Sequence, residues 1–138
     1  MVSGSLYGGA ALLDGYGGFE VSELPYYSGG VGSGWLARGG VKVIANIRGG
    51  GEFGPRWHQA ALKANRNKCY EDFAAVAKDL IDAQITSPRH LGIQGGSNGG
   101  LLVGAVLNQR PDLFGAALAL VGVMDMLRFH LFTAGVFW

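Results

Sequence analysis

One serine in this sequence stands between two glycines at a spacing that supports nucleophilic catalysis. Gly95, Ser97 and Gly99 form the pattern G-x-S-x-G within "GIQGGSNGGLLVGAV". When this pattern falls on a sharp turn from a strand into a helix, the serine hydroxyl is exposed above the sheet and the small neighbours let both elements pass closely. The chemistry would be attack on an acyl group, with a covalent intermediate. The alternative is a glycine-rich turn with a passive serine.

The residues on either side of Ser97 predict the two elements that such a turn needs. The segment "HLGIQ" before it is short and apolar, which favours a strand, and "GGLLVGAVLNQ" after it has helical spacing and ends before Pro111. A helix that begins at this point directs its free N–H groups and its positive end toward the serine, where a developing oxyanion would be stabilised.

The rest of the chain alternates between strand and helix patterns. Strands are predicted in "AALLDGYGGF", "VKVIANI" and "GAALALVGVM", a weak helix or loop in "YYSGGVGSGWLARGG", and a loop in "RGGGEFGPRW". A helix is predicted from Tyr70, with Glu71 and Asp72 in its first turn and a stop at Ser87-Pro88. Strands separated by helices predict an α/β fold with a parallel sheet and helices on both faces.

Composition limits the classes of partner. Of 138 residues, 49% are hydrophobic and only 15% are charged, so either both faces of the sheet are covered or partner segments are missing. The net charge of +1 gives no general attraction to nucleic acid or to a membrane surface. Most basic residues fall between Arg38 and Lys68, which we interpret as a solvated face. The longest apolar run, residues 116–124, is too short to span a bilayer.

Neither a disulfide nor a targeting signal is predicted. Cys69 is the single cysteine, and we interpret it as a small buried hydrophobic residue rather than a nucleophile. The first basic residue is Arg38, so the start lacks the charged segment of a secretory signal, and we expect a cytoplasmic location. The sequence predicts no cofactor and no metal site.

A second glycine pattern competes with the first. Gly49, Gly51 and Gly54 satisfy G-x-G-x-x-G directly after a predicted strand, as in dinucleotide-binding proteins. Pro55 and Trp57 follow where a helix should open, and no acidic residue ends a second strand about twenty residues later. We therefore reject dinucleotide binding.

A complete catalytic triad is not predicted inside the chain. Ser97, Asp125 and His130 occur in the order serine, acid, histidine, but the last two are only five residues apart. Such groups normally come from two different strand ends. We interpret Asp125 as a loop acid or helix cap and His130 as a partly buried packing residue, and we expect His58 and His90 to be structural or solvent-facing.

Three blocks of sequence resemble the prolyl oligopeptidase family of serine peptidases, which cut short peptides after proline. These blocks are "GYGGFEVS", "NIRGGGEFGPRWHQAALKANRNKCYEDF" and "GGSNGGLLVGAVLNQRPDLFGAALALVGVMDMLRFH". The resemblance extends from about Leu12 to Trp138, whereas "MVSGSLYGGAA" at the start has no such likeness.

The resemblance implies a role for six residues. Ser97 would be the nucleophile, the N–H of Asn98 one oxyanion donor, and the hydroxyl of Tyr16 the second. Phe19, Val123 and Trp138 match positions that line the proline pocket, with the indole of Trp138 stacked on the proline ring. Without the resemblance, we would interpret the last three as core residues.

The resemblance also implies what this chain lacks. In the family, the catalytic aspartate, the catalytic histidine and a substrate-binding arginine lie downstream of the position of Trp138, and a β-propeller domain gates access. We therefore expect residues 1–138 to form part of an α/β-hydrolase domain without its last strands and without the propeller, acting on short proline-containing peptides once completed. Two alternatives stay open: another α/β-hydrolase, such as an esterase or a dipeptidyl or acylaminoacyl peptidase, and a non-catalytic interaction fragment.

Overall fold

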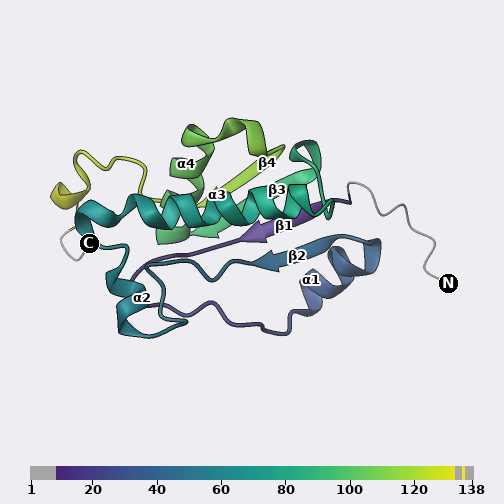
Figure 1. The fold of residues 1–138 in the computed structure, drawn as a ribbon, viewed down its shortest axis with the longest axis horizontal. Coiled ribbons are helices and arrows are strands. Elements are labelled where there is room, and N and C mark those ends of the chain that lie inside the picture. Colours follow the sequence, from purple (N-terminus) through teal and green to yellow (C-terminus); the bar gives the residue numbers. More distant parts are fainter. Residues whose placement is uncertain (1–8, 133–134, 136–138) are drawn as a thin grey trace.

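The computed structural model describes residues 9–132 and residue 135. These residues form one parallel sheet with strand order β2-β1-β3-β4, flanked by helices (Figure 1). The strands are β1 (Ala11–Asp14), β2 (Val41–Ile44), β3 (Leu91–Gly96) and β4 (Ala116–Leu120). The helices are α1 (Gly29–Gly34), α2 (Pro55–Gln59), α3 (Asn67–Asp82) and α4 (Asn98–Gln109). The predicted α/β class with a parallel sheet is confirmed.

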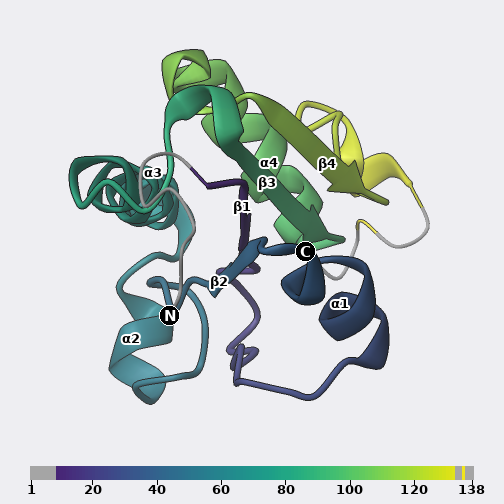
Figure 2. The ribbon, with the colours of Figure 1, turned by 90° about the vertical axis from the view of Figure 1, so that its right-hand side faces the viewer.

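Helices cover the two faces of the sheet unequally. Figure 2 shows α3 and α4 on one side and the short helix α1 on the other. On the α3 and α4 side, Leu13 and Ile93 from the sheet meet Phe73 and Leu102 from the helices, and all four side chains are fully buried. The main core therefore lies between the sheet and these two helices.

Helix α3 forms because its apolar residues return to one side. Cys69, Phe73, Ala77 and Leu80 recur every three or four residues and are the buried residues of the helix. The helix begins at Asn67 rather than Tyr70 and ends at Asp82, well before Ser87-Pro88, so its predicted first turn is wrong.

Asp72 of α3 has a distant partner in the fold. Asp72 lies in the second turn, and its carboxylate accepts hydrogen bonds from the backbone N–H of Arg48 at 3.0 Å and from Nε of Arg48 at 2.7 Å. This acid therefore anchors the loop after β2 to the helix, instead of balancing the helix dipole as predicted.

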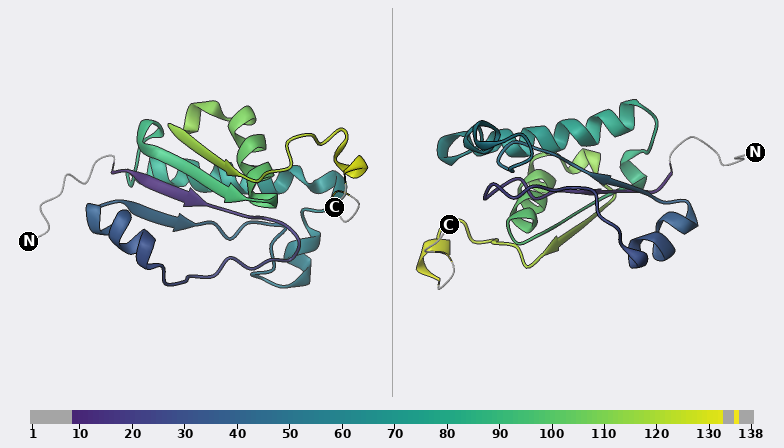
Figure 3. Two further views of the ribbon diagram at one scale, coloured as in Figure 1. Left: turned by 180° about the vertical axis from the view of Figure 1, so that it is seen from behind. Right: turned by 90° about the horizontal axis from the view of Figure 1, so that it is seen from below.

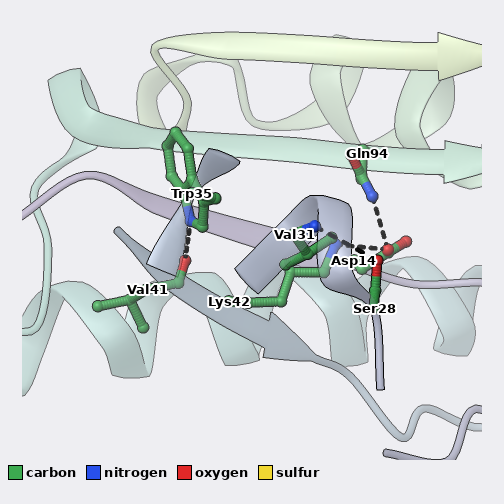
Figure 4. A network of polar contacts seen from close by, with 7 residues as sticks. All are labelled: Asp14, Ser28, Val31, Trp35, Val41, Lys42 and Gln94. Carbon is green, nitrogen blue, oxygen red and sulfur yellow. Dashed lines mark hydrogen bonds and ion pairs between the residues drawn. The ribbon is translucent and has the colours of Figure 1, made fainter. Parts of the chain in front are cut away.

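The opposite face of the sheet carries a polar cluster. Lys42 Nζ lies 2.7 Å from Asp14 Oδ2, and Gln94 Nε2 donates to the same oxygen at 2.7 Å (Figure 4). The three side chains come from β2, β1 and β3, so the cluster crosses three adjacent strands. The side chains of Lys42 and Asp14 are only 10% and 19% exposed.

Helix α1 is short, in agreement with the prediction of a weak helix or loop. Ser28 caps it by accepting the N–H of Val31 at 3.3 Å. The indole N–H of Trp35, just after the helix, donates to the carbonyl of Val41 at 2.9 Å (Figure 4). This bond attaches the α1 segment to the first residue of β2.

Two connections differ from the sequence prediction. The loop after β2 gives way at Pro55 to the short helix α2, because proline at the first helical position needs no N–H partner. Strand β4 ends at Leu120, since Val121 adopts a positive φ of 43°. The side chains of Leu118 and Leu120 are about half exposed on the α1 side. Among the described residues, no helix is both long and apolar enough to cross a membrane.

Candidate active site

The carboxyl ends of the four strands gather the candidate site residues. The strand arrows in Figure 1 point toward α2 and toward the segment after β4, and Figure 3 shows the same end of the sheet from behind and from below. Ligands of open parallel sheets bind at this end, because the loops there carry side chains that the strands position. The loops after β1, β3 and β4 hold Tyr16, Ser97 and Val123.

Ser97 occupies the strained turn that the sequence predicts. It lies between the end of β3 at Gly96 and the start of α4 at Asn98, with φ of 55° and ψ of −114°. This conformation is rare for a residue with a side chain and is typical of functional sites. The backbone N–H of Ser97 donates to the carbonyl of Leu120 at 2.9 Å, which fixes the turn to the end of β4.

The flanking glycines allow the strand and the helix to cross. A Cβ atom on Gly95 would collide with the carbonyl of Gly99, and one on Gly99 would lie 2.5 Å from the carbonyl oxygen of Gly15. Only hydrogen fits at both positions. The turn therefore has the form of a nucleophile elbow.

The start of α4 provides an unused hydrogen-bond donor beside Ser97. Within the part of the chain that the structure describes, the backbone N–H of Asn98 has no acceptor. The N–H groups of Gly100 and Leu101, further along the first turn, donate to the carbonyl of Ser97 at 3.0 and 3.2 Å. The N–H of Asn98 and the positive end of a twelve-residue helix are thus available to an anion at the elbow.

The turn after β1 lies against the elbow. The side-chain Nδ2 of Asn98 donates to the carbonyl of Tyr16 at 2.7 Å, so the two predicted oxyanion donors belong to adjacent segments. Gly17, Phe19 and Glu20 all adopt positive φ angles of 64°, 52° and 56°. This run of left-handed residues bends the chain sharply away from the sheet.

Two pockets lie at this end of the sheet, and Asn98 of the elbow lines the larger one. Phe19 and Asn98 line an open pocket of about 640 Å³, and Val123 lines a second one of about 280 Å³. Phe129 lines both. The structure therefore places Phe19 and Val123 in neighbouring pockets, and Trp138 lies outside the described residues.

The first pocket is mainly apolar with several charged side chains. Its walls include the side chains of Phe19, Leu62, Leu101, Met126 and Phe129. Glu20 contributes one carboxylate, and Lys63, Arg66 and His58 contribute basic groups.

None of the three histidines is hydrogen-bonded to Ser97 among residues 9–132 and 135. His58 Nδ1 lies 2.6 Å from the carbonyl of Gly49, and His90 Nδ1 lies 3.0 Å from the Ser87 hydroxyl. Both are structural contacts, as predicted. His130 meets only the edge of the Phe129 ring and is exposed, so the prediction of partial burial is wrong.

Asp125 caps a turn, as predicted. Its Oδ1 accepts the backbone N–H of Arg128 at 3.1 Å, and its Oδ2 accepts Nε of the same residue at 2.7 Å. With both oxygens occupied by Arg128, the carboxylate is not oriented toward a histidine. Within the described residues, neither a histidine nor Asp125 is therefore hydrogen-bonded to Ser97.

Cys69 is buried, as predicted. Its side chain is fully buried under the turn after β1, and its Sγ donates to the carbonyl of Gly17 at 3.3 Å. Burial raises the pKa of the thiol to about 11, so it stays protonated at neutral pH.

The glycine loop after β2 uses its backbone donors internally. The N–H of Gly49 donates to Trp57 at 3.1 Å, and the N–H of Gly51 donates to Val21 at 3.0 Å. A phosphate-binding loop would leave these groups free. The loop instead supports the turn after β1, in agreement with the rejection of dinucleotide binding. In the described part of the chain, no cluster of His, Cys, Asp or Glu could hold a metal ion.

Sequence reasoning missed Arg66. This residue precedes α3, and its guanidinium reaches the carbonyl of Gly17 at 2.6 Å and the side chain of Asn98 at 2.8 Å. The signal for this role in the sequence was weak. An acid four residues after Arg66 would have paired with it on the helix surface, but Tyr70 stands there instead.

Comparison with known proteins agrees with this geometry. The chain is 54% identical over 127 residues to an uncharacterized peptidase of Sinorhizobium fredii, covering 92% of this chain and 18% of that protein. It is 50% identical over 128 residues to a prolyl endopeptidase of Dictyostelium discoideum, covering 91% of this chain and 17% of that one. The chain thus spans less than a fifth of the length of these relatives.

Solved structures give the same result. The structure of a post-proline cleaving enzyme from Rickettsia typhi superposes with a TM-score of 0.94 at 49% identity, covering 97% of this chain and 20% of that one. The family model described as the prolyl oligopeptidase family matches residues 31–138. The elbow at Ser97 agrees with these matches, which place the chain in the prolyl oligopeptidase family.

Proposed function

We propose that the protein containing this chain is a serine peptidase and that Ser97 is its nucleophile. The observation that carries the proposal is the elbow itself, where a strained serine stands beside the unpaired N–H of Asn98. A strained backbone at a residue with a side chain is typical of functional sites, and here the strain exposes a hydroxyl that could react.

The reaction would proceed through an acyl-enzyme. Ser97 Oγ would attack the peptide carbonyl carbon, its proton passing to a general base, and the carbonyl oxygen would become an oxyanion. The N–H of Asn98 and the hydroxyl of Tyr16 would stabilise that oxyanion. Each donor would lower the activation free energy by about 2.7 to 4 kcal/mol. The C–N bond would then break as the leaving amine takes the proton, and water would release the acyl group by the same steps.

We further propose that the general base and its aspartate come from parts of the full-length protein outside this chain. The support is that no described histidine contacts Ser97 and that the relatives are more than five times longer than the matched region. A gating propeller domain would belong to the same additional sequence.

We propose that the substrates are short peptides cleaved after proline. Proline has no backbone N–H, so its site needs flat apolar walls rather than an acceptor. Phe19 lines the pocket beside Asn98, Val123 lines a second pocket that shares Phe129 with it, and the family resemblance adds Trp138. Arg66 and Lys63 outnumber the carboxylate of Glu20 in the larger pocket, which disfavours a basic side chain there.

Labelling with a fluorophosphonate probe tests the nucleophile. We expect the full-length protein to label at Ser97, the Ser97→Ala variant to lose all labelling, and Ser33→Ala, at an exposed position on α1, to label like the parent. The isolated 138-residue chain should not label, because it lacks a base. Labelling that persists in Ser97→Ala would refute the assignment, and strong labelling of the isolated chain would assign the base to this sequence.

Reporter amides test the specificity. The full-length protein should cleave a Gly-Pro reporter faster than Arg or Phe reporters, and Trp138→Ala should lower kcat/KM for the proline reporter about ten-fold, the equivalent of roughly 1.4 kcal/mol. Faster cleavage of the Arg reporter would replace the post-proline assignment with a peptidase of different specificity.

A further inference from the structure

The guanidinium of Arg66 joins the two segments that carry the proposed oxyanion donors. Its Nη1 donates to the carbonyl of Gly17 at 2.6 Å, in the turn after β1, and its Nη2 donates to Oδ1 of Asn98 at 2.8 Å, at the start of α4. Arg66 itself stands just before α3. One planar side chain thus connects three separate elements.

The side-chain amide of Asn98 completes this connection. It is 2% exposed, its Oδ1 accepts from Arg66, and its Nδ2 donates to the carbonyl of Tyr16 at 2.7 Å. The opposite orientation of the amide would place its NH₂ group against the guanidinium and its oxygen against a carbonyl. Arg66 therefore fixes which way the Asn98 amide points, and the amide in turn holds Tyr16.

The turn after β1 lies close against the side chain of Asn98. A Cβ atom on Gly18 would collide with Nδ2 of Asn98, so the turn after β1 packs directly onto this side chain. Cys69 Sγ adds a second donor to the carbonyl of Gly17 from α3. The position of the turn relative to the elbow thus depends on a small set of hydrogen bonds centred on Arg66.

The charge of Arg66 is not neutralised by a carboxylate within the described residues. Its partners are the two oxygens, the hydroxyl of Tyr70 at 3.4 Å and the face of the Tyr70 ring at 5.5 Å. It lines the same pocket as Phe19 and Asn98. A cation held in this place favours negative charge at the elbow as well as fixing the geometry.

We propose that Arg66 is a positioning residue that holds the N–H of Asn98 and the hydroxyl of Tyr16 at the spacing an oxyanion requires. The inference rests on the proposed peptidase function and adds to it a residue that does not touch the substrate's reacting atoms. Oxyanion donors act only when they are fixed in advance at the place where charge develops, so a small displacement lowers the rate of the chemical step rather than substrate binding.

The test is Arg66→Met in the full-length protein, which keeps much of the side-chain length but removes the donors and the charge. With the Gly-Pro reporter, which brings no charged side chain into the pocket, we expect kcat to fall about 10- to 100-fold with KM within about two-fold of the parent, because the loss is mainly of transition-state stabilisation. Arg66→Lys keeps the charge but cannot bridge both oxygens in the same plane, so it should recover part of the loss. Arg56→Met, on exposed α2, is the matched control and should match the parent.

Two further measurements separate positioning from a general loss of structure. A peptide aldehyde ending in a prolyl aldehyde binds as a tetrahedral adduct, so its affinity should fall in Arg66→Met by the same factor as kcat/KM. In a double-mutant cycle with Tyr16→Phe, the effect of Arg66→Met should be smaller than in the parent, since both changes damage one oxyanion hole.

The outcomes are distinct. If the parent is active and a folded Arg66→Met variant keeps its kcat, or shows only a raised KM, the positioning role is refuted while the peptidase assignment stands. If Arg66→Met fails to fold, Arg66→Lys decides: a parental kcat refutes the proposal, and a lowered kcat at parental KM supports it. If the parent shows no labelling at Ser97 and no peptide cleavage, the proposed function fails and the role of Arg66 fails with it.

Discussion

Replacing Ser97 by glycine should stabilise the protein relative to replacing it by alanine. The backbone of Ser97, with φ of 55° and ψ of −114°, is the mirror image of an extended conformation and is easily accessible only to glycine. A side chain in such a conformation costs about 1 to 3 kcal/mol. Alanine keeps that strain, whereas glycine removes it but loses about 0.5 to 1 kcal/mol through its more flexible unfolded chain. The net difference should be about 0.5 to 2 kcal/mol in favour of Ser97→Gly.

Thermal unfolding of the two full-length variants measures this difference. Because the shift in Tm per kcal/mol falls as a protein becomes larger, Ser97→Gly should melt above Ser97→Ala by about a degree or more. Ser87 is the matched control, because its φ of −132° is ordinary for any residue, and there glycine should be the less stable replacement. Equal stability of the two Ser97 variants, or a higher Tm for alanine, would show that the elbow is not strained.

Three further predictions follow from the same structure. Tyr16→Phe should lower kcat about 10²- to 10³-fold in a steady-state assay with little change in Tm, since it removes one oxyanion donor; a loss confined to KM would contradict this role. Burial, followed by repulsion from Asp14 and Glu52, raises the pKa of Glu23. The protonated side chain therefore stabilises the fold fully below the ordinary pKa of a glutamate, and this stabilisation is lost as the pH rises through the raised pKa. Glu23→Gln should raise Tm at pH 7 and leave Tm unchanged at pH 3. Cys69, with its thiol pKa raised to about 11 by burial, should resist alkylation at pH 8 in the folded protein and react in urea, as mass spectrometry would detect.

Patterns with a local cause were predictable from the sequence. The elbow was predictable because a strand-to-helix turn of this kind needs small residues two positions before and after the serine, and glycines stand at both positions. The buried side of α3 was predictable because Phe73 and Ala77 follow helical spacing. These features are encoded within about fifteen consecutive residues.

Features that depend on distant partners were not predictable. From the sequence, Asp72 is an acid in the first turn of a helix, and its bond to Arg48, from the loop after β2, is visible only in the structure. Arg66 reads as one cation among several in a basic stretch, because its partners Gly17 and Asn98 are 49 and 32 residues away. The specificity residues remain predictions, since Phe19 and Val123 have apolar side chains that a core would also use.

The polar cluster on the α1 face limits how related sequences can diverge. Lys42 is only 10% exposed in this chain, so a protein that loses the carboxylate of Asp14 leaves a largely buried ammonium group without its hydrogen-bonded partner, which is destabilising. Gln94, bound to the same oxygen, loses its acceptor in that step. Positions 14, 42 and 94 should therefore change together over evolutionary time, and pairs of homologues should show either all three polar residues or a joint replacement by apolar ones. Joint changes at these three positions would therefore show which strands are neighbours in the sheet that positions Tyr16 and Ser97.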